Sequence, residues 1–426
     1  MCVPSDSAPY FVVRIEQPHD VANGGHVAII RETSDDESAR VHPVVRHQGE
    51  KLHDELYKSQ GLRQLLDAVA TGSGPLTIFV RLFSSASPPW ELVYHPTQQF
   101  LSLDAKDRWP IVRVAGTHPT RRPDVIALPL RVAIVLGAAQ LDANGQWTDL
   151  YDALVASGIA FEIHVFVAQG DLLAAIRAVA DRRVHAEVVP SSTGALMGRL
   201  AEVRPHVLHA FAHGFESGSS YLQIATPLGY DGSPEYQIYV GATDLGTLSR
   251  SLSLVVLNAC RGAAGNGQVE SLAFELVCKH GIPATIGMRN IIDASDAHRF
   301  AKAFYVDAFE RLASSAIDGK ARSVPWAYSI RKGREALCSK HVGPAQAIAE
   351  ANAEWTLPVL FVCDPELTLR LAVPVTPLSA EEQVRLATER KVLSAALDAG
   401  LEEEAPPAVV TVLRSRISEI EAQLGT

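Results

Sequence analysis

Two apolar stretches decide the fold: HVLHAFAHG covers residues 206–214, and LSLVVLNAC covers residues 252–260. Each is a short run of mainly aliphatic residues that ends in a side chain capable of chemistry, His213 in the first and Cys260 in the second. Near-continuous apolar runs of this length predict strands that are covered on both faces, as in parallel sheets with crossover helices. We therefore expect residues 206–212 and 252–259 to be central strands of an α/β sheet.

Further runs of the same kind lie on both sides of these two. They are RVAIVLG (131–137), FEIHVFV (161–167), VHAEVV (184–189), PATIG (283–287) and LPVLFV (357–362). The segments between the runs predict helices near 146–157, 171–182, 194–203, 243–250, 269–280, 295–312 and 324–339. This alternation predicts a doubly wound, mostly parallel sheet with helices on both faces, over residues 126–376. Residues 219–245 predict a β-hairpin that turns at 229–233, on the rim of the sheet.

The flanking parts differ in character. Residues 1–125 predict a small α+β module, with strands at 10–16, 26–31 and from Leu76, a helix that carries Leu52 to Val69, and a hairpin in 88–103. Residues 377–426 predict a helical hairpin, which opens with the capping-box pair Ser379 and Glu382. The apolar stripe of this hairpin either docks on the main domain or binds a partner, such as a regulatory protein.

The composition excludes several classes of protein. With 47% hydrophobic and 20% charged residues the chain is globular, and its formal net charge of −10 offers no basic face for nucleic acid. We see neither a signal peptide nor an apolar stretch long enough to insert into a membrane. Five cysteines, odd in number and irregularly spaced, favour reduced thiols and hence a cytoplasmic location.

The ends of the two central strands point to thiol chemistry. A thiolate needs a nearby base, and an imidazole supplies one while lowering the pKa of the sulfur. In His213-Gly214 the glycine lets a substrate backbone approach, and the amides of Gly214 and Cys260 are candidate donors to an oxyanion. The alternative is that His-Gly and Ala-Cys at strand ends only serve packing.

Several blocks of sequence resemble the CHAT family of the caspase and separase clan. They are PWELVY with FLSL, LPLRVAIVLGA, HAFAHGF, VVLNACRGA and SLAFELVCKHGIPATIGMRNIIDASDAHRFAKAFY, in the order that the family shows. The resemblance covers roughly 75–370 and implies a caspase-like cysteine endopeptidase. It implies His213 as the general base, Cys260 as the nucleophile, and the amides of Gly214 and Cys260 as the oxyanion hole.

The substrate-binding side is predicted from the same blocks. Arg261 and Gly262, in the small-residue loop after the nucleophile, would line the cleft. Asp244, Asp293 and Asp296 are candidate pocket acids that would favour a basic residue before the cut. Each of the three has an alternative interpretation as a helix cap or solvated loop residue. The segment GMRNIIDASDA differs from the glutamine-containing version expected in the family, and the long helical repeats common in CHAT proteins are not seen.

The resemblance implies a biological setting as well as a reaction. We expect an endopeptidase that cuts a dedicated protein substrate, such as a pore-forming or signalling protein, in bacterial defence or regulated cell death. The alternative is a catalytically silent caspase-like adaptor that binds partners in a signalling complex. The two differ in the reactivity of Cys260 toward an electrophilic peptide.

Metal and cofactor sites are not expected. On a helix, His206, His209 and His213 would line one face as a metal site, but Pro205 and Gly214 bracket too short a segment. On a strand, His206 faces away from the other two, which lie roughly 13 Å apart. Neither GxGxxG nor GxxxxGK[ST] occurs at the required place, and thiol proteolysis needs no cofactor.

Overall fold

The computed structural model describes residues 12–14, 26–31, 45–71, 76–82, 88–104, 106, 109–115, 125–259, 271–318, 322–323, 326–341, 345–363, 368–372, 380–396 and 417. These belong to two compact units, residues 1–372 and 373–426. The first contains all the described strands, and the second contains one described helix, α11 (Ala380–Ala396).

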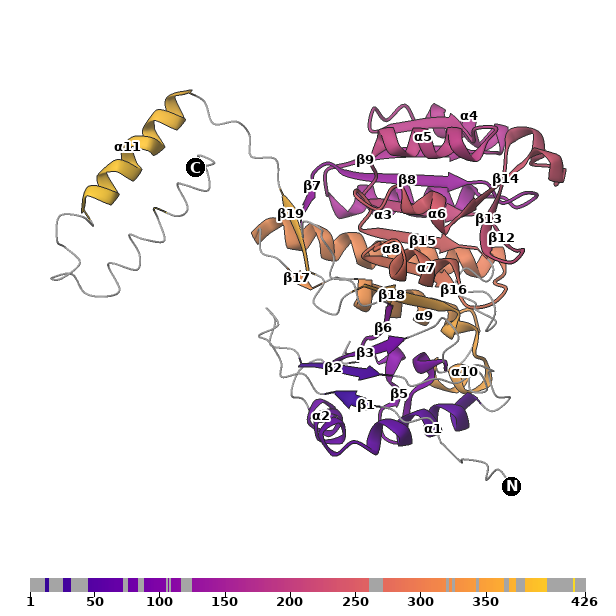
Figure 1. The fold of residues 1–426 in the computed structure, drawn as a ribbon, viewed down its shortest axis with the longest axis vertical. Coiled ribbons are helices and arrows are strands. Elements are labelled where there is room, and N and C mark those ends of the chain that lie inside the picture. The colour runs from indigo at the N-terminus through magenta and orange to yellow at the C-terminus, as the bar shows by residue number, and fades with distance from the viewer. Residues whose placement is uncertain are drawn as a thin grey trace, which may run out of the picture. The chain divides into compact units, whose positions relative to one another are not determined.

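An eleven-stranded sheet forms the centre of the described part of the first unit (Figure 1). In spatial order its strands are β1 (Val12–Arg14), β2 (His26–Arg31), β3 (Leu76–Leu82), β6 (Ile111–Ala115), β18 (Pro358–Val362), β16 (Ala284–Met288), β15 (Leu254–Asn258), β11 (Val207–Phe211), β8 (Leu130–Leu136), β9 (Phe161–Val167) and β10 (Val184–Val188). All seven apolar runs of the sequence are strands of this sheet, with ends within two residues of those predicted.

The sheet is mostly parallel, as predicted. The six strands from β16 to β10 run in one direction, β18, β6, β3 and β2 run in the other, and only β16–β18 and β1–β2 pair antiparallel. Every residue of β11, β15, β16 and β18 is buried. Strands covered on both faces explain why these segments read as unbroken Val, Ile and Leu rather than as an alternating pattern.

Helices cover both faces of the sheet. They are α3 (Asn144–Ser157), α4 (Gly170–Ala178), α5 (Thr193–Val203), α6 (Ala242–Gly246), α7 (Leu272–Cys278), α8 (Ala294–Asp318) and α9 (Trp326–Cys338). Helix α8 packs on both α3 and α9, whereas α6 packs on both α5 and α7. The chain moves outward from β8 to β10 and then returns to β11, so right-handed crossovers place α3 and α5 on opposite faces.

A second, three-stranded antiparallel sheet follows the end of β11. It consists of β12 (His213–Glu216), β13 (Ser220–Ala225) and β14 (Gln237–Gly241). The predicted hairpin is β13 with β14, since Ile224 of one pairs with Ile238 of the other. Strand β12 was not predicted, because HGFE has no apolar alternation. The sequence therefore missed the strand that carries His213.

The N-terminal segment joins the main sheet. Its described strands β2 and β3 pair with each other, β3 pairs with β6, and β6 pairs with β18. The one helix predicted from Leu52 to Val69 is two, α1 (Val45–Tyr57) and α2 (Gln60–Ala70), and the predicted hairpin is β4 (Tyr94–His95) with β5 (Gln99–Phe100). The division at residue 125 stays a prediction, and strands from both sides of it lie in one sheet.

Smaller elements complete the description. A three-stranded sheet is formed by β17 (Arg322–Ser323), β19 (Thr368–Ala372) and β7 (Val125–Ala127), and one further helix is α10 (Ala345–Ala351). Helix α11 confirms the first helix of the predicted C-terminal hairpin, and the segment expected to form the second helix falls outside the described residues except Ile417. None of the helices in the described ranges is both long enough and apolar enough to span a bilayer.

Candidate active site

The register of two central strands places the ends that matter side by side. Strands β11 and β15 are parallel neighbours, with Val207 opposite Leu254 and Phe211 opposite Asn258. His213 follows Phe211 by two residues, and Cys260 follows Asn258 by two residues. The two strand ends that lead to the predicted catalytic residues thus lie side by side at the carboxyl edge, where open α/β sheets place their ligands.

The His213 ring is held by a backbone carbonyl. Its Nε2 lies 2.9 Å from the carbonyl oxygen of Ala139, which follows β8, the other neighbour of β11. A carbonyl only accepts, so Nε2 carries the proton and donates it, which leaves Nδ1 as the basic nitrogen. The ring is half-buried, and the hydrogen bond to Ala139 holds its orientation.

Cys260, Arg261 and Gly262 fall outside the described residues. The last described residue before them is Ala259, which is buried at the end of β15. The strand end is anchored by Asn258, whose Nδ2 donates a 2.9 Å hydrogen bond to the carbonyl oxygen of Ala297 in α8. The buried amide side chain fixes the point from which the chain continues to Cys260.

Gly214, the predicted oxyanion donor, lies in β12 and is exposed. Strand β12 pairs with β13, with Gly214 opposite Leu222. The hairpin is fastened to the sheet at Gly137, whose amide donates to Phe211 and whose carbonyl accepts from Ala225. A Cβ at Gly137 would lie 2.3 Å from Ile224 Cγ2, so only glycine permits this approach.

The three candidate pocket acids have different surroundings. Asp244 lies in the first turn of α6 and accepts a 2.9 Å hydrogen bond from the Gly241 amide, which is the capping role weighed as its alternative. Asp296 is buried near the start of α8, with its carboxylate 2.5 Å from Lys340 Nζ. Asp293 is exposed, and its carbonyl accepts from the amide of Ala297. Of the three, only Asp293 is exposed to solvent, and the specificity assignment stays a prediction.

The other two histidines of this segment do not join His213 in a metal site. The segment is a strand, as expected, and His209 lies within it, fully buried and 3.0 Å through Nδ1 from the Tyr305 hydroxyl. Burial, with His298 as a lesser cause, lowers the pKa of His209 to about 3. His206 lies 2.8 Å through Nε2 from the Arg131 guanidinium, and burial followed by this charge lowers its pKa to about 4. Both rings are neutral at pH 7 and serve packing.

A buried charge cluster, which the sequence did not reveal, lies beside the same edge. The carboxylate of Glu91, in the short helix η2 (Trp90–Leu92), receives two hydrogen bonds from Arg113 of β6, at 3.0 and 2.7 Å. Arg289, directly after β16, donates a third at 2.7 Å, and Arg334 of α9 lies 3.6 Å away. Burial alone would raise the pKa of Glu91, but the three guanidinium groups hold it well below its usual range.

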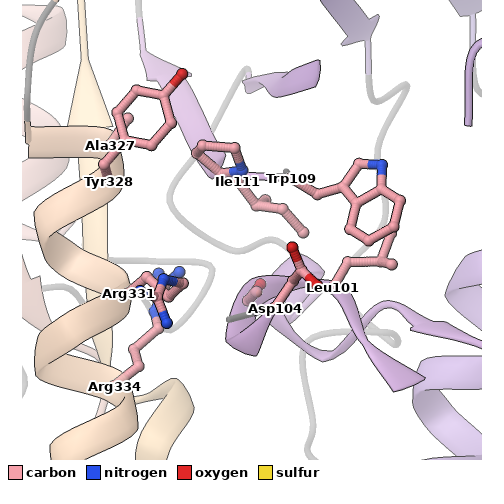
Figure 2. A pocket seen from close by; sticks show the side chains of 10 residues that line it. Leu101, Asp104, Trp109, Ile111, Ala327, Tyr328, Arg331 and Arg334 are labelled. Carbon is pink, nitrogen blue, oxygen red and sulfur yellow. The ribbon is translucent and has the colours of Figure 1, made fainter. Parts of the chain in front are cut away.

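A small pocket adjoins this cluster. It is lined by Leu101, Ser102, Asp104, Trp109, Pro110, Ile111, Ala327, Tyr328, Arg331 and Arg334 (Figure 2). Figure 2 shows Arg331 and Arg334 on the helix that forms one wall, with Asp104 and Trp109 on the opposite side. Since Arg334 also donates to the carbonyl of Pro358 at 2.9 Å, its guanidinium joins β18, α9 and the Glu91 cluster. We interpret the cluster as a structural joint between the N-terminal strands and the rest of the sheet.

A family model for the CHAT domain matches residues 46–316, a range that includes both His213 and Cys260. The chain belongs to the CHAT domain family. This confirms the family inferred from the sequence and supports a cysteine protease fold. The match begins well before residue 126. No curated protein matches the chain.

Three solved structures match parts of the chain at low sequence identity. The chain is 11% identical to the Arg-specific cysteine proteinase gingipain R, covering 84% of this chain and 80% of that one, with a TM-score of 0.45. It is 14% identical to the Saccharomyces cerevisiae separase in complex with securin, covering 75% of this chain but only 18% of that one, with a TM-score of 0.37. A hypothetical protein from Streptococcus mutans is 12% identical, covering 57% of this chain and 94% of that one, with a TM-score of 0.26.

Proposed function

We propose that the protein is a cysteine endopeptidase in which His213 is the general base and Cys260 is the nucleophile. The observation that carries the proposal is the pairing of Phe211 with Asn258 in adjacent parallel strands. His213 comes two residues after Phe211, and Cys260 comes two residues after Asn258. The segments that carry the imidazole and the thiol therefore leave the sheet from neighbouring strands of a rigid frame.

The orientation of His213 supports its role as a base. With Nε2–H donated to the carbonyl of Ala139, Nδ1 has a lone pair available to take the thiol proton from Cys260. The thiolate then attacks the scissile carbonyl carbon, and the oxyanion is stabilised by the amides of Gly214 and Cys260. The imidazolium returns its proton to the leaving amine, and water attacks the resulting thioester to release the acid and regenerate the thiol.

The other described thiols are poorly suited to this chemistry. Cys338 is buried, and burial raises its pKa to about 12, so it is protonated at neutral pH. Cys363 is buried at the end of β18, and Cys278 is half-buried in α7. A thiol must ionise and be reached to act as a nucleophile. Cys338 and Cys278 therefore provide internal comparisons for the reactivity of Cys260.

The substrate proposed is a dedicated protein, in a bacterial defence or regulated cell-death pathway. The test is to map new protein amino termini by mass spectrometry in cells that express the wild type, Cys260→Ala or His213→Ala. The proposal expects termini that occur with the wild type and with neither variant. Cys278→Ala is the matched control, since it removes a thiol from the same unit and should leave the termini unchanged.

Two results would argue against the proposal. Termini that persist in Cys260→Ala would exclude this cysteine as the nucleophile. Identical termini in all cells, together with equally slow alkylation of Cys260 and Cys278 by an electrophilic peptide, would favour a catalytically silent adaptor. Circular dichroism of the purified variants separates loss of chemistry from loss of folding.

A further inference from the structure

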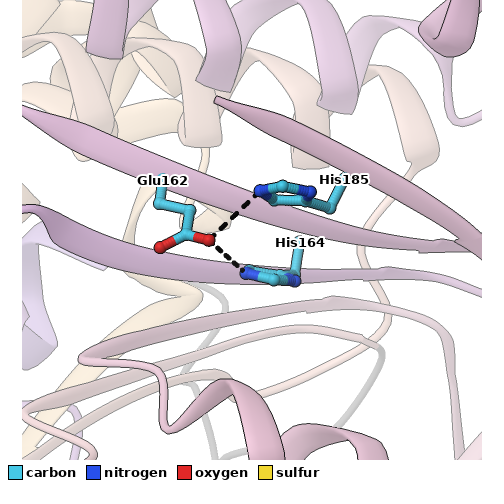
Figure 3. A group of neighbouring side chains, drawn as sticks. All are labelled: Glu162, His164 and His185. Carbon is cyan, nitrogen blue, oxygen red and sulfur yellow. Dashed lines mark hydrogen bonds and ion pairs between the residues drawn. The ribbon is translucent and has the colours of Figure 1, made fainter. Parts of the chain in front are cut away.

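A cluster of metal-ligand side chains lies on the two outermost strands at one end of the sheet, away from His213. Glu162 and His164 are alternate residues of β9, so they point to the same face, and His185 is the direct neighbour of His164 on β10. The sequence shows the E-x-H spacing, but only the register of the two strands brings the second imidazole beside it. Figure 3 shows the three side chains converging.

The atoms have a spacing suited to a metal ion. Glu162 Oε1 lies 3.1 Å from His164 Nε2 and 3.1 Å from His185 Nε2. The three ligand atoms all lie within 4.8 Å of one another, and no other such group occurs in the described ranges. Tetrahedral zinc with ligands at about 2.0–2.1 Å separates its ligand atoms by about 3.3 Å, close to the two measured contacts.

The two imidazoles are already arranged in parallel. Their rings stack with centroids 4.6 Å apart and an angle of 23° between the planes. A site on two adjacent backbone strands needs only side-chain rotation to close around an ion.

Charges around the cluster do not prevent a cation from binding. On the same face of β10, Glu187 pairs with Arg199 of α5, with 2.5 Å between Arg199 and Oε1. Arg131, opposite Glu162 on β8, is directed to His206 and to the carbonyl of Arg204. Among the described residues, the side-chain contacts of Glu162 are thus those with the two histidines, at 3.1 Å each.

We propose that Glu162, His164 and His185 bind a divalent ion of the zinc type, with water completing the coordination on the exposed side. Two histidines and one carboxylate are a donor set that zinc, cobalt and nickel accept. The ion would join β10, the last strand in the sheet order, to β9. The site is distinct from the predicted catalytic pair because none of these residues lies beyond the midpoint of its strand, whereas the pair is predicted to lie past the carboxyl ends of the strands.

The affinity should be moderate. His164 Nδ1 is buried, and no hydrogen-bond partner for it occurs among the described residues. A hydrogen-bond acceptor for the ring nitrogen that does not bind the metal usually raises metal affinity by about 10- to 100-fold. No such acceptor for His164 occurs among the described residues. Binding in the micromolar range is therefore expected, which is suited to stabilisation of the sheet end rather than to permanent retention of the ion.

The test is a titration of the full-length protein with zinc chloride by calorimetry, in a Cys260→Ala background that removes the most reactive thiol. One ion per chain should bind, and His164→Gln and His185→Gln should each weaken binding by about tenfold or more. His47→Gln is the matched control. His47 lies 4.0 Å from Glu50 on α1, but the two do not belong to the group of three metal-ligand side chains found in the described residues.

Cobalt chloride gives a second readout that does not depend on affinity alone. Cobalt in a four-coordinate, tetrahedral site gives intense visible absorption. This absorption should vanish in His164→Gln and remain in His47→Gln. The melting temperature of the parent should rise by a few degrees with zinc, and that of His185→Gln should not. His185 is exposed, so this substitution is expected to leave folding unaffected. Absence of binding in the parent, or equal loss in His47→Gln, would overturn the proposal. Neither result bears on proteolysis.

Discussion

Removal of the negative charge of Glu91 should strongly destabilise the protein. In Glu91→Gln the side chain keeps its size, but Arg113, Arg289 and Arg334 lose the one carboxylate that they share. Glu91 and Arg113 have side chains only 1% and 2% exposed, so water cannot replace the lost partner. The guanidinium groups would remain buried and would repel one another.

The magnitude follows from this burial. Breaking a buried ion pair by removal of one partner costs about 3–5 kcal/mol, because an uncompensated charge remains inside. For a chain of this size, about 2 °C per kcal/mol translates this into a drop in melting temperature of roughly 6–10 °C. Exposed pairs contribute far less, so Glu50→Gln, which breaks the exposed Arg46–Glu50 pair on α1, should leave the melting temperature unchanged within scatter.

The effect should also depend on pH. The pKa of Glu91 is depressed in the folded protein, so its stabilisation is present above the unfolded value of about 4.3 and is lost as pH falls below it. The difference between wild type and Glu91→Gln should therefore shrink in acid. Thermal melts followed by tryptophan fluorescence, with buried Trp90 beside the site, measure this directly. A melting temperature for Glu91→Gln equal to that of the wild type at pH 7 would refute the reasoning.

Two further predictions concern the frame of the site. Gly137→Ala should cost about 1–3 kcal/mol because its Cβ meets Ile224, whereas Gly198→Ala in α5, with no heavy atom within 4 Å of the new Cβ, should gain about 0.4–1 kcal/mol; similar melting temperatures for the two variants would contradict this. His206 has its pKa lowered to about 4, so the unfolded chain binds the extra proton and stability falls as pH decreases from about 6.5 towards 4. In His206→Asn the slope of unfolding free energy between pH 6.5 and 4.5 should be smaller by up to about 1.4 kcal/mol per unit, and an unchanged slope would exclude the assignment.

The central strands were predictable because they are buried on both faces. Their unbroken apolar runs are typical of strands covered on both faces, and all of them lie in the sheet. Strand β6 was missed because IVRVA contains Arg113, a charge that a buried strand tolerates only through Glu91. That partner is 22 residues away, and nothing in the local pattern indicates the pair.

In the candidate site too, some features were predictable from the sequence and others were not. His213 was predicted from its place at a strand end, and the structure puts it beside the strand that leads to Cys260. The carbonyl of Ala139, which orients the ring, could not be predicted, since a backbone group has no signal in the sequence. The alternating Glu162 and His164 were visible, but their meeting with His185 depends on strand register.

The most direct test of the catalytic pair is the pH dependence of alkylation of Cys260 by a small electrophile, followed by peptide mass spectrometry. With His213 as its partner, the thiol should react rapidly at and below neutral pH, and much faster than Cys278. In His213→Ala the pH profile of the Cys260 alkylation rate should move to that of an ordinary thiol, with half of the maximal rate at about pH 8.5. Identical profiles for Cys260 with and without His213 would contradict the proposed pair.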